Sequence, residues 1–173
     1  MHERDSMAFE TKGGEREQGS DTAWPRYQPW VTLALFSLLV NFAWEVLVPP
    51  FYAFHAAAPH SITVLACLRS SFGDAGITIG SYAAVAAIDT RRWINAASPR
   101  LIAAYIACGV GVTIALEYIS VYRMGRWTYS SIMPTIGGIG VVPLVQWLVL
   151  PLVILWLSHR HLAGAIAIQS SRR

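Results

Sequence analysis

Four long apolar segments, separated by shorter polar ones, dominate the sequence. They cover residues 30–48, 73–88, 101–122 and 141–157. At about 1.5 Å per residue, the first segment would form a helix of roughly 28 Å, close to the roughly 30 Å hydrocarbon core of a bilayer. The pattern predicts an all-α protein: a polytopic bundle of four transmembrane helices, in one domain over residues 29–158.

The segments outside these apolar runs are polar or broken by glycine and proline. Residues 1–28 mix both charges with few apolar side chains, and we expect a disordered tail there, with a second tail over residues 159–173. After the first span, residues 61–69 have the composition of a short interfacial helix. The connection over residues 123–140 contains Gly137, Gly138 and Gly140, and we expect a loop.

The first apolar segment carries a polar stripe. Ser37, Asn41 and Glu45 recur every fourth residue, so they share one face of a helix. A carboxyl group at bilayer depth costs roughly 2.5–3.5 kcal/mol on insertion scales, so it is rarely turned toward lipid. We expect this face to point into the bundle. Glu45 then either belongs to a functional site or hydrogen-bonds neighbouring helices together.

The next two spans repeat this arrangement. Asp74, Thr78 and Ser81 form a polar face in the second, and Thr113, Glu117 and Ser120 form one in the third. Each of these helices also has small residues four apart, a spacing that lets another helix approach closely. We expect close packing along these two stripes, which are Gly76, Gly80 and Ala84 in the second span and Ala107, Gly111 and Ala115 in the third.

Positive charge sets the expected orientation. Ten of the 13 Lys and Arg residues lie in the two tails and the second connection, on one side of the predicted membrane. We expect the protein in the cell membrane, and the positive-inside rule then places both termini in the cytoplasm. In this orientation Glu45, Asp74, Glu117 and Gln146 all lie at a similar depth, in the outer part of the bilayer. We therefore predict that the three acids converge on one outer-leaflet pocket.

Composition narrows the class of protein. The chain is 54% hydrophobic and only 13% charged, against about 25% charged in soluble domains. The net charge of +3 comes from basic residues near the ends of the apolar runs, so it favours membrane lipids rather than nucleic acid as partners. Cys67 and Cys108 lie in apolar surroundings without CxxC spacing, which favours packing roles over a disulfide.

Acids that share a poorly solvated site do not all ionise together, and this is the environment that acid–base chemistry needs. One carboxylic acid can protonate an alkene, and a neighbouring carboxylate can stabilise the carbocation or remove a proton. Aromatic faces can shelter that cation. We predict Glu45, Asp74 and Glu117 as catalytic residues. The predicted substrate-binding residues are Asn41, Trp44, Arg123, Arg126, Trp127, Gln146 and Trp147.

Three short stretches resemble the EXPERA-type membrane isomerases, the emopamil-binding protein group. That group has His-xxx-Glu in its first core helix, Glu-Thr-Ile-Thr in the next, and Trp followed by Leu-Val-Leu-Pro in the last. Here Asn41-xxx-Glu45 replaces the first, with Asn in place of His, and residues 74–78 and 147–151 match the others. The resemblance extends over roughly residues 35–157. It implies a bundle that holds a lipid and isomerase or cyclase chemistry on an isoprenoid.

Two other classes of function fit the same pattern. Outward-facing acids suit a carrier or binding protein for a proton, a small cation or an amine. Four helices are few for a monomeric carrier, so a transport function would imply a homo-oligomer. In a structural or assembly protein, the acids would only hydrogen-bond between helices. His55 and His60 lack the spacing of metal ligands on a helix. We predict neither a metal nor a cofactor.

Overall fold

The computed structural model describes residues 24–53, 58–88 and 98–171. Four long helices make up most of it: α1 (Trp24–Leu47), α2 (His60–Ile88), α3 (Pro99–Tyr118) and α4 (Val141–Ser171). Each contains a stretch long and apolar enough to cross a membrane, namely Pro29–Leu47, His60–Ile88, Pro99–Arg123 and Val141–Ala165. The predicted all-α, four-span architecture is confirmed, and it is that of a multi-pass membrane protein.

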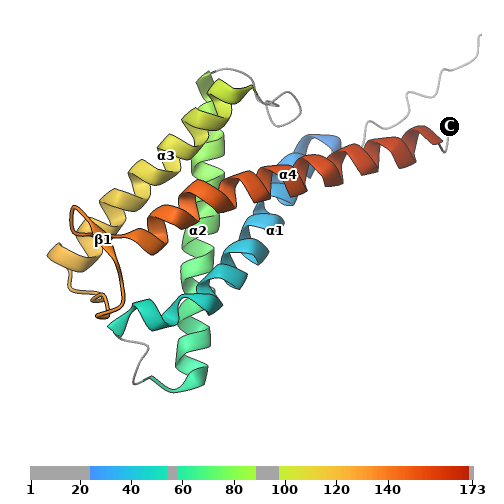
Figure 1. Ribbon diagram of the computed structural model, residues 1–173. Helices are drawn as coiled ribbons and strands as arrows, with labels where there is room; N and C mark the ends of the chain where they lie inside the picture. The colour runs from blue at the N-terminus through green and yellow to red at the C-terminus, as the bar shows by residue number, and fades with distance from the viewer. Residues whose placement is uncertain (1–23, 54–57, 89–97, 172–173) are drawn as a thin grey trace, which may run out of the picture.

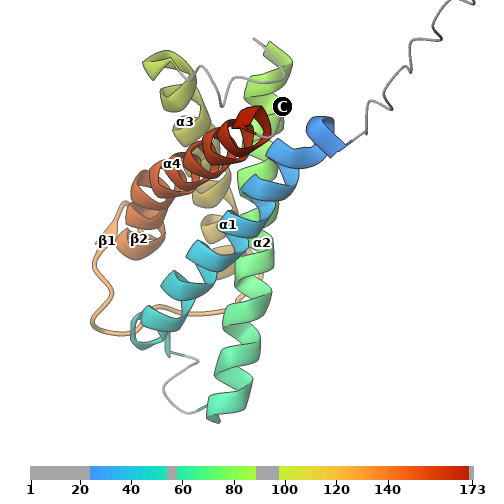
Figure 2. The ribbon, with the colours of Figure 1, turned by 90° about the vertical axis from the view of Figure 1, so that its right-hand side faces the viewer.

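The helices form a closed ring of neighbours. α1 packs against α2 and α4, and α3 packs against the same two helices from the other side. Figure 1 shows α4 crossing the bundle obliquely, and Figure 2 shows α1 running beside α2. The core is aliphatic and aromatic; Leu33, Tyr82, Tyr105 and Ile154 are almost fully buried in it.

Local sequence accounts for the ends of the helices. α1 stops at Pro49-Pro50, which continues as a single 3-10 turn, η1 (Pro49–Phe51). α3 starts at Pro99, and the Ser98 side chain accepts a hydrogen bond from the Leu101 amide, as an N-cap does. After α3 the chain makes one π-helical turn, η4 (Ile119–Arg123).

Two boundaries differ from the predicted ones. Residues 61–69 do not form a separate interfacial helix, because they are the first turns of a continuous α2. α4 continues to Ser171, so most of the predicted second tail is helical. The predicted first tail falls largely on residues 1–23, outside the described residues, and residues 24–28 already belong to α1.

A small hairpin interrupts the predicted loop before α4. Its strands, β1 (Thr135–Ile136) and β2 (Ile139–Gly140), pair antiparallel. The two residues between them, Gly137 and Gly138, both have positive φ, of 58° and 84°. This conformation favours glycine and is typical of tight hairpin turns. The Tyr122 hydroxyl donates a 2.6 Å hydrogen bond to the Gly138 carbonyl and so ties the turn back to η4.

The small-residue stripes do not lie where we predicted. On α2, Gly76, Gly80 and Ala84 are exposed, and Ala107, Gly111 and Ala115 are exposed on α3. The polar faces point inward instead: Thr78, Ser81 and Thr113 are each less than 10% exposed. In this ring, close helix contact occurs at Gly109, where a Cβ atom would clash with the Trp147 ring.

Candidate functional site

Polar side chains from three helices meet between α1, α2 and α4. Gln146 of α4 donates from Nε2 to Asn41 Oδ1 of α1 at 3.0 Å and to Asp74 Oδ2 of α2 at 2.9 Å. Asn41 in turn donates to the carbonyl and the hydroxyl of Ser37 at 2.8 and 3.2 Å. Asn41 and Gln146 are 2% and 5% exposed, so one amide pair links three spans inside the bundle.

The Glu45 and Asp74 carboxyl groups are hydrogen-bonded to each other. An ionised carboxylate only accepts hydrogen bonds, so such a contact exists only when one of the two groups carries a proton. A pair in this arrangement can share one proton between two oxygen atoms. α1 and α2 are further joined where the Cys67 thiol donates to the Glu45 carbonyl at 3.2 Å. Cys67 and Cys108 are both free thiols.

The third acid, Glu117, is held by a different set of partners. Its Oε2 accepts a 2.6 Å hydrogen bond from the Tyr129 hydroxyl and a 3.4 Å one from the Trp127 indole N–H. Both partners come from the connection between η4 and β1. Glu117 is near enough to Glu45 and Asp74 to act on them electrostatically. The structure thus brings the acids of three helices to one end of the bundle, in two adjoining hydrogen-bonded groups.

Tyr52 is a member of this site that the sequence analysis did not include among the site residues. It forms an isolated antiparallel bridge with Tyr129, and their ring centroids are 6.1 Å apart. Burial, followed by the charges of Glu117 and Glu45, raises the pKa of the Tyr52 phenol above its ordinary range. The proximity of both carboxyl groups places Tyr52 beside the two groups of acids.

The connection from Trp127 to Gly140 covers this end of the bundle. The Tyr129 hydroxyl accepts a 3.0 Å hydrogen bond from the Gly140 amide. The Ser130 hydroxyl donates to the Pro50 carbonyl at 2.8 Å, and the Ala53 amide donates to the Thr128 carbonyl at 3.0 Å. η1 and the connection are therefore fastened to each other, to β2 and to Glu117.

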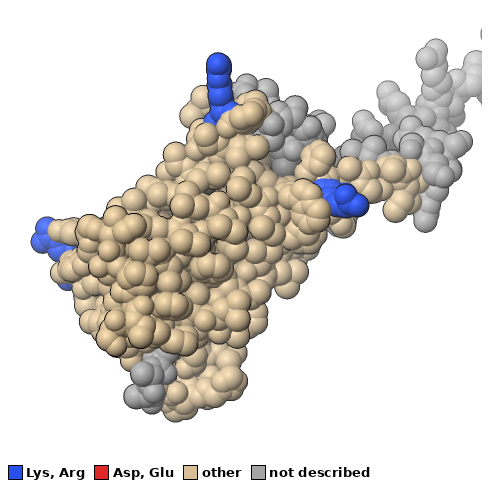
Figure 3. All heavy atoms as spheres, viewed as in Figure 1, with Lys and Arg blue, Asp and Glu red and all other residues tan. Residues whose placement is uncertain are grey.

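The remaining predicted substrate-binding residues differ in their exposure. Trp147 is 2% exposed and packs on Gly109, so it joins α4 to α3. Arg123 and Arg126 are exposed. On the face drawn in Figure 3, Lys and Arg lie only at the edges and no Asp or Glu is visible. The three described acids lie within the candidate spans, on inward faces.

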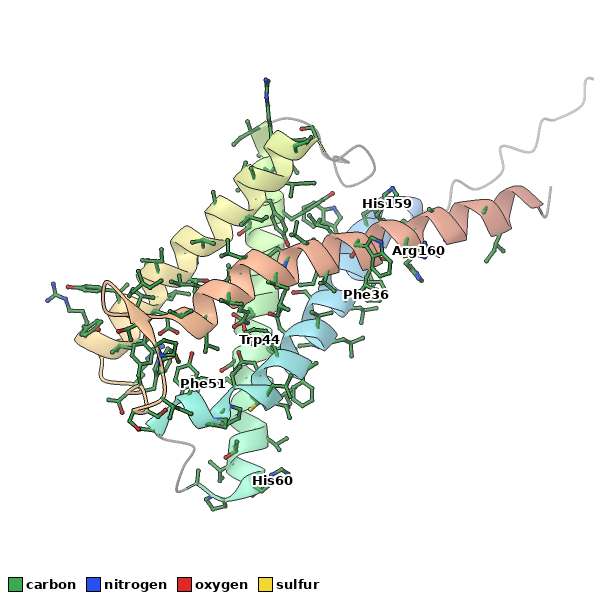
Figure 4. The ribbon with its side chains drawn as sticks, in the orientation of Figure 1. Phe36, Trp44, Phe51, His60, His159 and Arg160 are labelled. Carbon is green, nitrogen blue, oxygen red and sulfur yellow. The ribbon has the colours of Figure 1, made fainter. Side chains whose placement is uncertain are left out.

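An apolar groove of about 270 Å³ lies between α1 and α4. Its walls contain no acid; they are Trp44, Leu47, Val48, Phe51, Val141, Val142 and Val145. Figure 4 labels Trp44 and Phe51 at the end of α1 near the hairpin. Because Trp44 precedes Glu45 and Val145 precedes Gln146, the groove lies at the same level as the polar groups. The groove is thus a hydrocarbon-like surface at the same level of the bundle as the acids.

We expect Gln146→Leu to destabilise the bundle by about 1–2 kcal/mol, because it leaves Asn41 Oδ1 and Asp74 Oδ2 without their donor. The free energy of unfolding would be measured by SDS titration in mixed micelles. Val149→Leu, at an exposed position of the same helix, is the control and should leave stability unchanged. Equal stability of Gln146→Leu and wild type would contradict a contribution of this network to folding.

Comparisons with protein-family models, with curated proteins and with solved structures give no match to this chain. The fold and site therefore define a class only: a multi-pass membrane protein with four candidate spans and a buried carboxyl–amide network at one end.

Proposed function

We propose that this protein binds an isoprenoid-like lipid and moves a double bond in it by carboxyl acid–base chemistry. The observation that carries the proposal is the hydrogen-bonded Glu45–Asp74 pair within two candidate spans. The apolar groove at the same level of the bundle supports it, because a hydrocarbon chain entering from the bilayer would find a complementary surface there. The resemblance to the EXPERA-type isomerases points to the same chemistry.

We assign Glu45 as the proton donor, because it pairs with Asp74 and directly follows Trp44, which lines the apolar groove. In the proposed reaction the Glu45 O–H bond breaks and a C–H bond forms at one alkene carbon, which leaves a carbocation beside it. The Trp44 ring lies at the groove and can stabilise this cation through its π face. A carboxylate then removes a proton from the other neighbouring carbon, and the double bond is formed one position along. The reaction needs no co-reactant.

The test is proton exchange with solvent during turnover. Purified protein in lipid nanodiscs would be incubated in D2O with isoprenoid alkenes of different chain lengths, and the products analysed by mass spectrometry. We expect one deuterium atom per isomerised molecule and a shifted double bond. Absence of both, with every chain length tested and with protein shown to be folded, would refute the proposal.

A second candidate is a structural or assembly role, and one observation favours it. Gln146, Asn41 and Asp74 join three helices through hydrogen bonds, as interhelical polar contacts do in membrane bundles. In that case the acids contribute to folding alone. Variants of the acids would then lower melting temperature and abundance together with any measured activity.

The orientation we infer is that both termini lie in the cytoplasm, with the acidic network and the hairpin near the opposite surface. It rests on the excess of Lys and Arg in the tails and second connection. Single cysteines introduced at exposed Ser131 and Ser98, both outside the candidate spans, in a background without Cys67 and Cys108, would be treated with a membrane-impermeant maleimide in intact cells. We expect labelling at position 131 only, and the reverse pattern would invert the topology.

A further inference from the structure

Tyr129 links the acids to the covering connection. Its hydroxyl donates to Glu117 Oε2 at 2.6 Å and accepts from the Gly140 amide at 3.0 Å. Glu117 is only 7% exposed, whereas Tyr129 keeps partial exposure, as does Ser130 beside it. A phenol both donates and accepts hydrogen bonds, so this hydroxyl can give up a proton and take another, on a residue that contacts a buried carboxyl and keeps partial exposure.

The proposed reaction needs a path for a proton. Glu45 gives one up, while the proton taken from the substrate arrives on another carboxylate. One proton must therefore return to Glu45 before the next cycle. Tyr52 lies near Glu45, Glu117 and Tyr129, and so neighbours both groups of acids.

We propose that Tyr129 is the point at which the buried acids exchange protons with water, and that Tyr52 relays protons between Glu117 and Glu45. In each step the phenol O–H proton passes to a carboxylate oxygen. The phenol oxygen takes a replacement, from water in the case of Tyr129 and from Glu117 in the case of Tyr52. No charge accumulates on either ring. The purpose of this proton relay rests on the proposed function, but the exchange rate that tests it can be measured without a substrate.

The protonation state of the phenols agrees with this role. Burial, and then the hydrogen bond to Glu117, raises the pKa of Tyr129, as burial does for Tyr52. Both hydroxyl groups therefore keep their protons at neutral pH and are available as donors. Trp127 also donates to Glu117, but an indole N–H has no lone pair with which to accept a replacement proton.

The test is the rate of hydrogen–deuterium exchange of the carboxyl groups, followed without substrate by infrared spectroscopy after transfer of reconstituted protein into D2O. We expect Tyr129→Phe to slow exchange roughly tenfold, which corresponds to about 1.4 kcal/mol in barrier height. Tyr122→Phe is the matched control. The Tyr122 hydroxyl also holds this connection in place, through its hydrogen bond to the Gly138 carbonyl. Removing this hydroxyl should leave the exchange rate unchanged.

Equal rates in wild type and Tyr129→Phe would overturn the proposal, and so would equal slowing in both phenylalanine variants, which would assign the effect to the fastening of the connection. If Tyr129→Phe does not fold, 3,5-difluorotyrosine at position 129 keeps the ring and the hydroxyl and alters only the acidity. An exchange rate that does not change with this replacement would equally overturn the relay. Because no substrate is present, the outcome is separate from the isomerisation assay.

Discussion

Replacing Glu45 by glutamine is expected to lower deuterium incorporation into an isoprenoid substrate by about 100-fold or more, since general acid catalysis typically contributes 10²–10⁴-fold. The amide has nearly the same shape, but it cannot deliver a proton to an alkene. Asp74→Asn should have a similar effect, because in the proposed reaction Asp74 shares a proton with Glu45. Initial rates in nanodiscs, with the amount of folded protein measured alongside, provide the comparison.

Val46→Leu is the matched control for this variant. Val46 is the next residue of α1 and is 48% exposed, so it faces away from the acids. Its replacement should retain wild-type rates. If Glu45→Gln lowers the melting temperature and the abundance in proportion to activity, the carboxyl pair acts in folding, and the structural candidate replaces the catalytic one.

The fold could be predicted from the sequence because its main signals are local. The length of each apolar run sets a span, and polar residues at helical spacing identify the face that avoids lipid. Ser37 and Asn41 on α1, Thr78 and Ser81 on α2, and Thr113 on α3 are all buried as predicted. The physical cause is that moving a polar side chain from lipid into the bundle lowers the free energy more than moving any other side chain of the same helix.

The small-residue stripes failed as a signal for the same reason. Spacing shows that Gly76 and Gly80 share a face, but not that a helix lies against it. Exposing a glycine to lipid costs little free energy, so small residues occur on both the lipid-facing and the interior face of a helix. The polar and small faces of α2 compete for the interior, and the polar face, with Asp74, occupies it.

The candidate site could be predicted only in part, because its remaining members come from distant segments. Asn41, Asp74 and Gln146 were found because each is conspicuous in an apolar helix. Tyr52 and Tyr129 are ordinary aromatic residues near the ends of the spans, and neither was predicted as a site residue. Their roles depend on a bridge between η1 and the connection before β1, which no local pattern reveals.

Gly109→Ala is expected to destabilise the protein by about 2 kcal/mol, and so lower its Tm by roughly 4–8 °C. A Cβ atom at this position would clash with the Trp147 ring, which is 2% exposed and so has little space into which to move. The added methyl group therefore forces α3 and α4 apart. Thermal unfolding in detergent, followed by near-UV circular dichroism of the tryptophans, measures the shift.

Gly111→Ala makes the identical change two residues along the same helix, where a Cβ atom would meet nothing within 4 Å. There the substitution removes only the poor helix propensity of glycine, so Tm should stay level or rise slightly. Opposite outcomes at the two positions would establish that α3 turns Gly109, and not the Ala107–Gly111–Ala115 stripe, toward α4. A fall in Tm at Gly111 with none at Gly109 would mean that α3 is rotated about its axis, which would also turn Glu117 away from Tyr129.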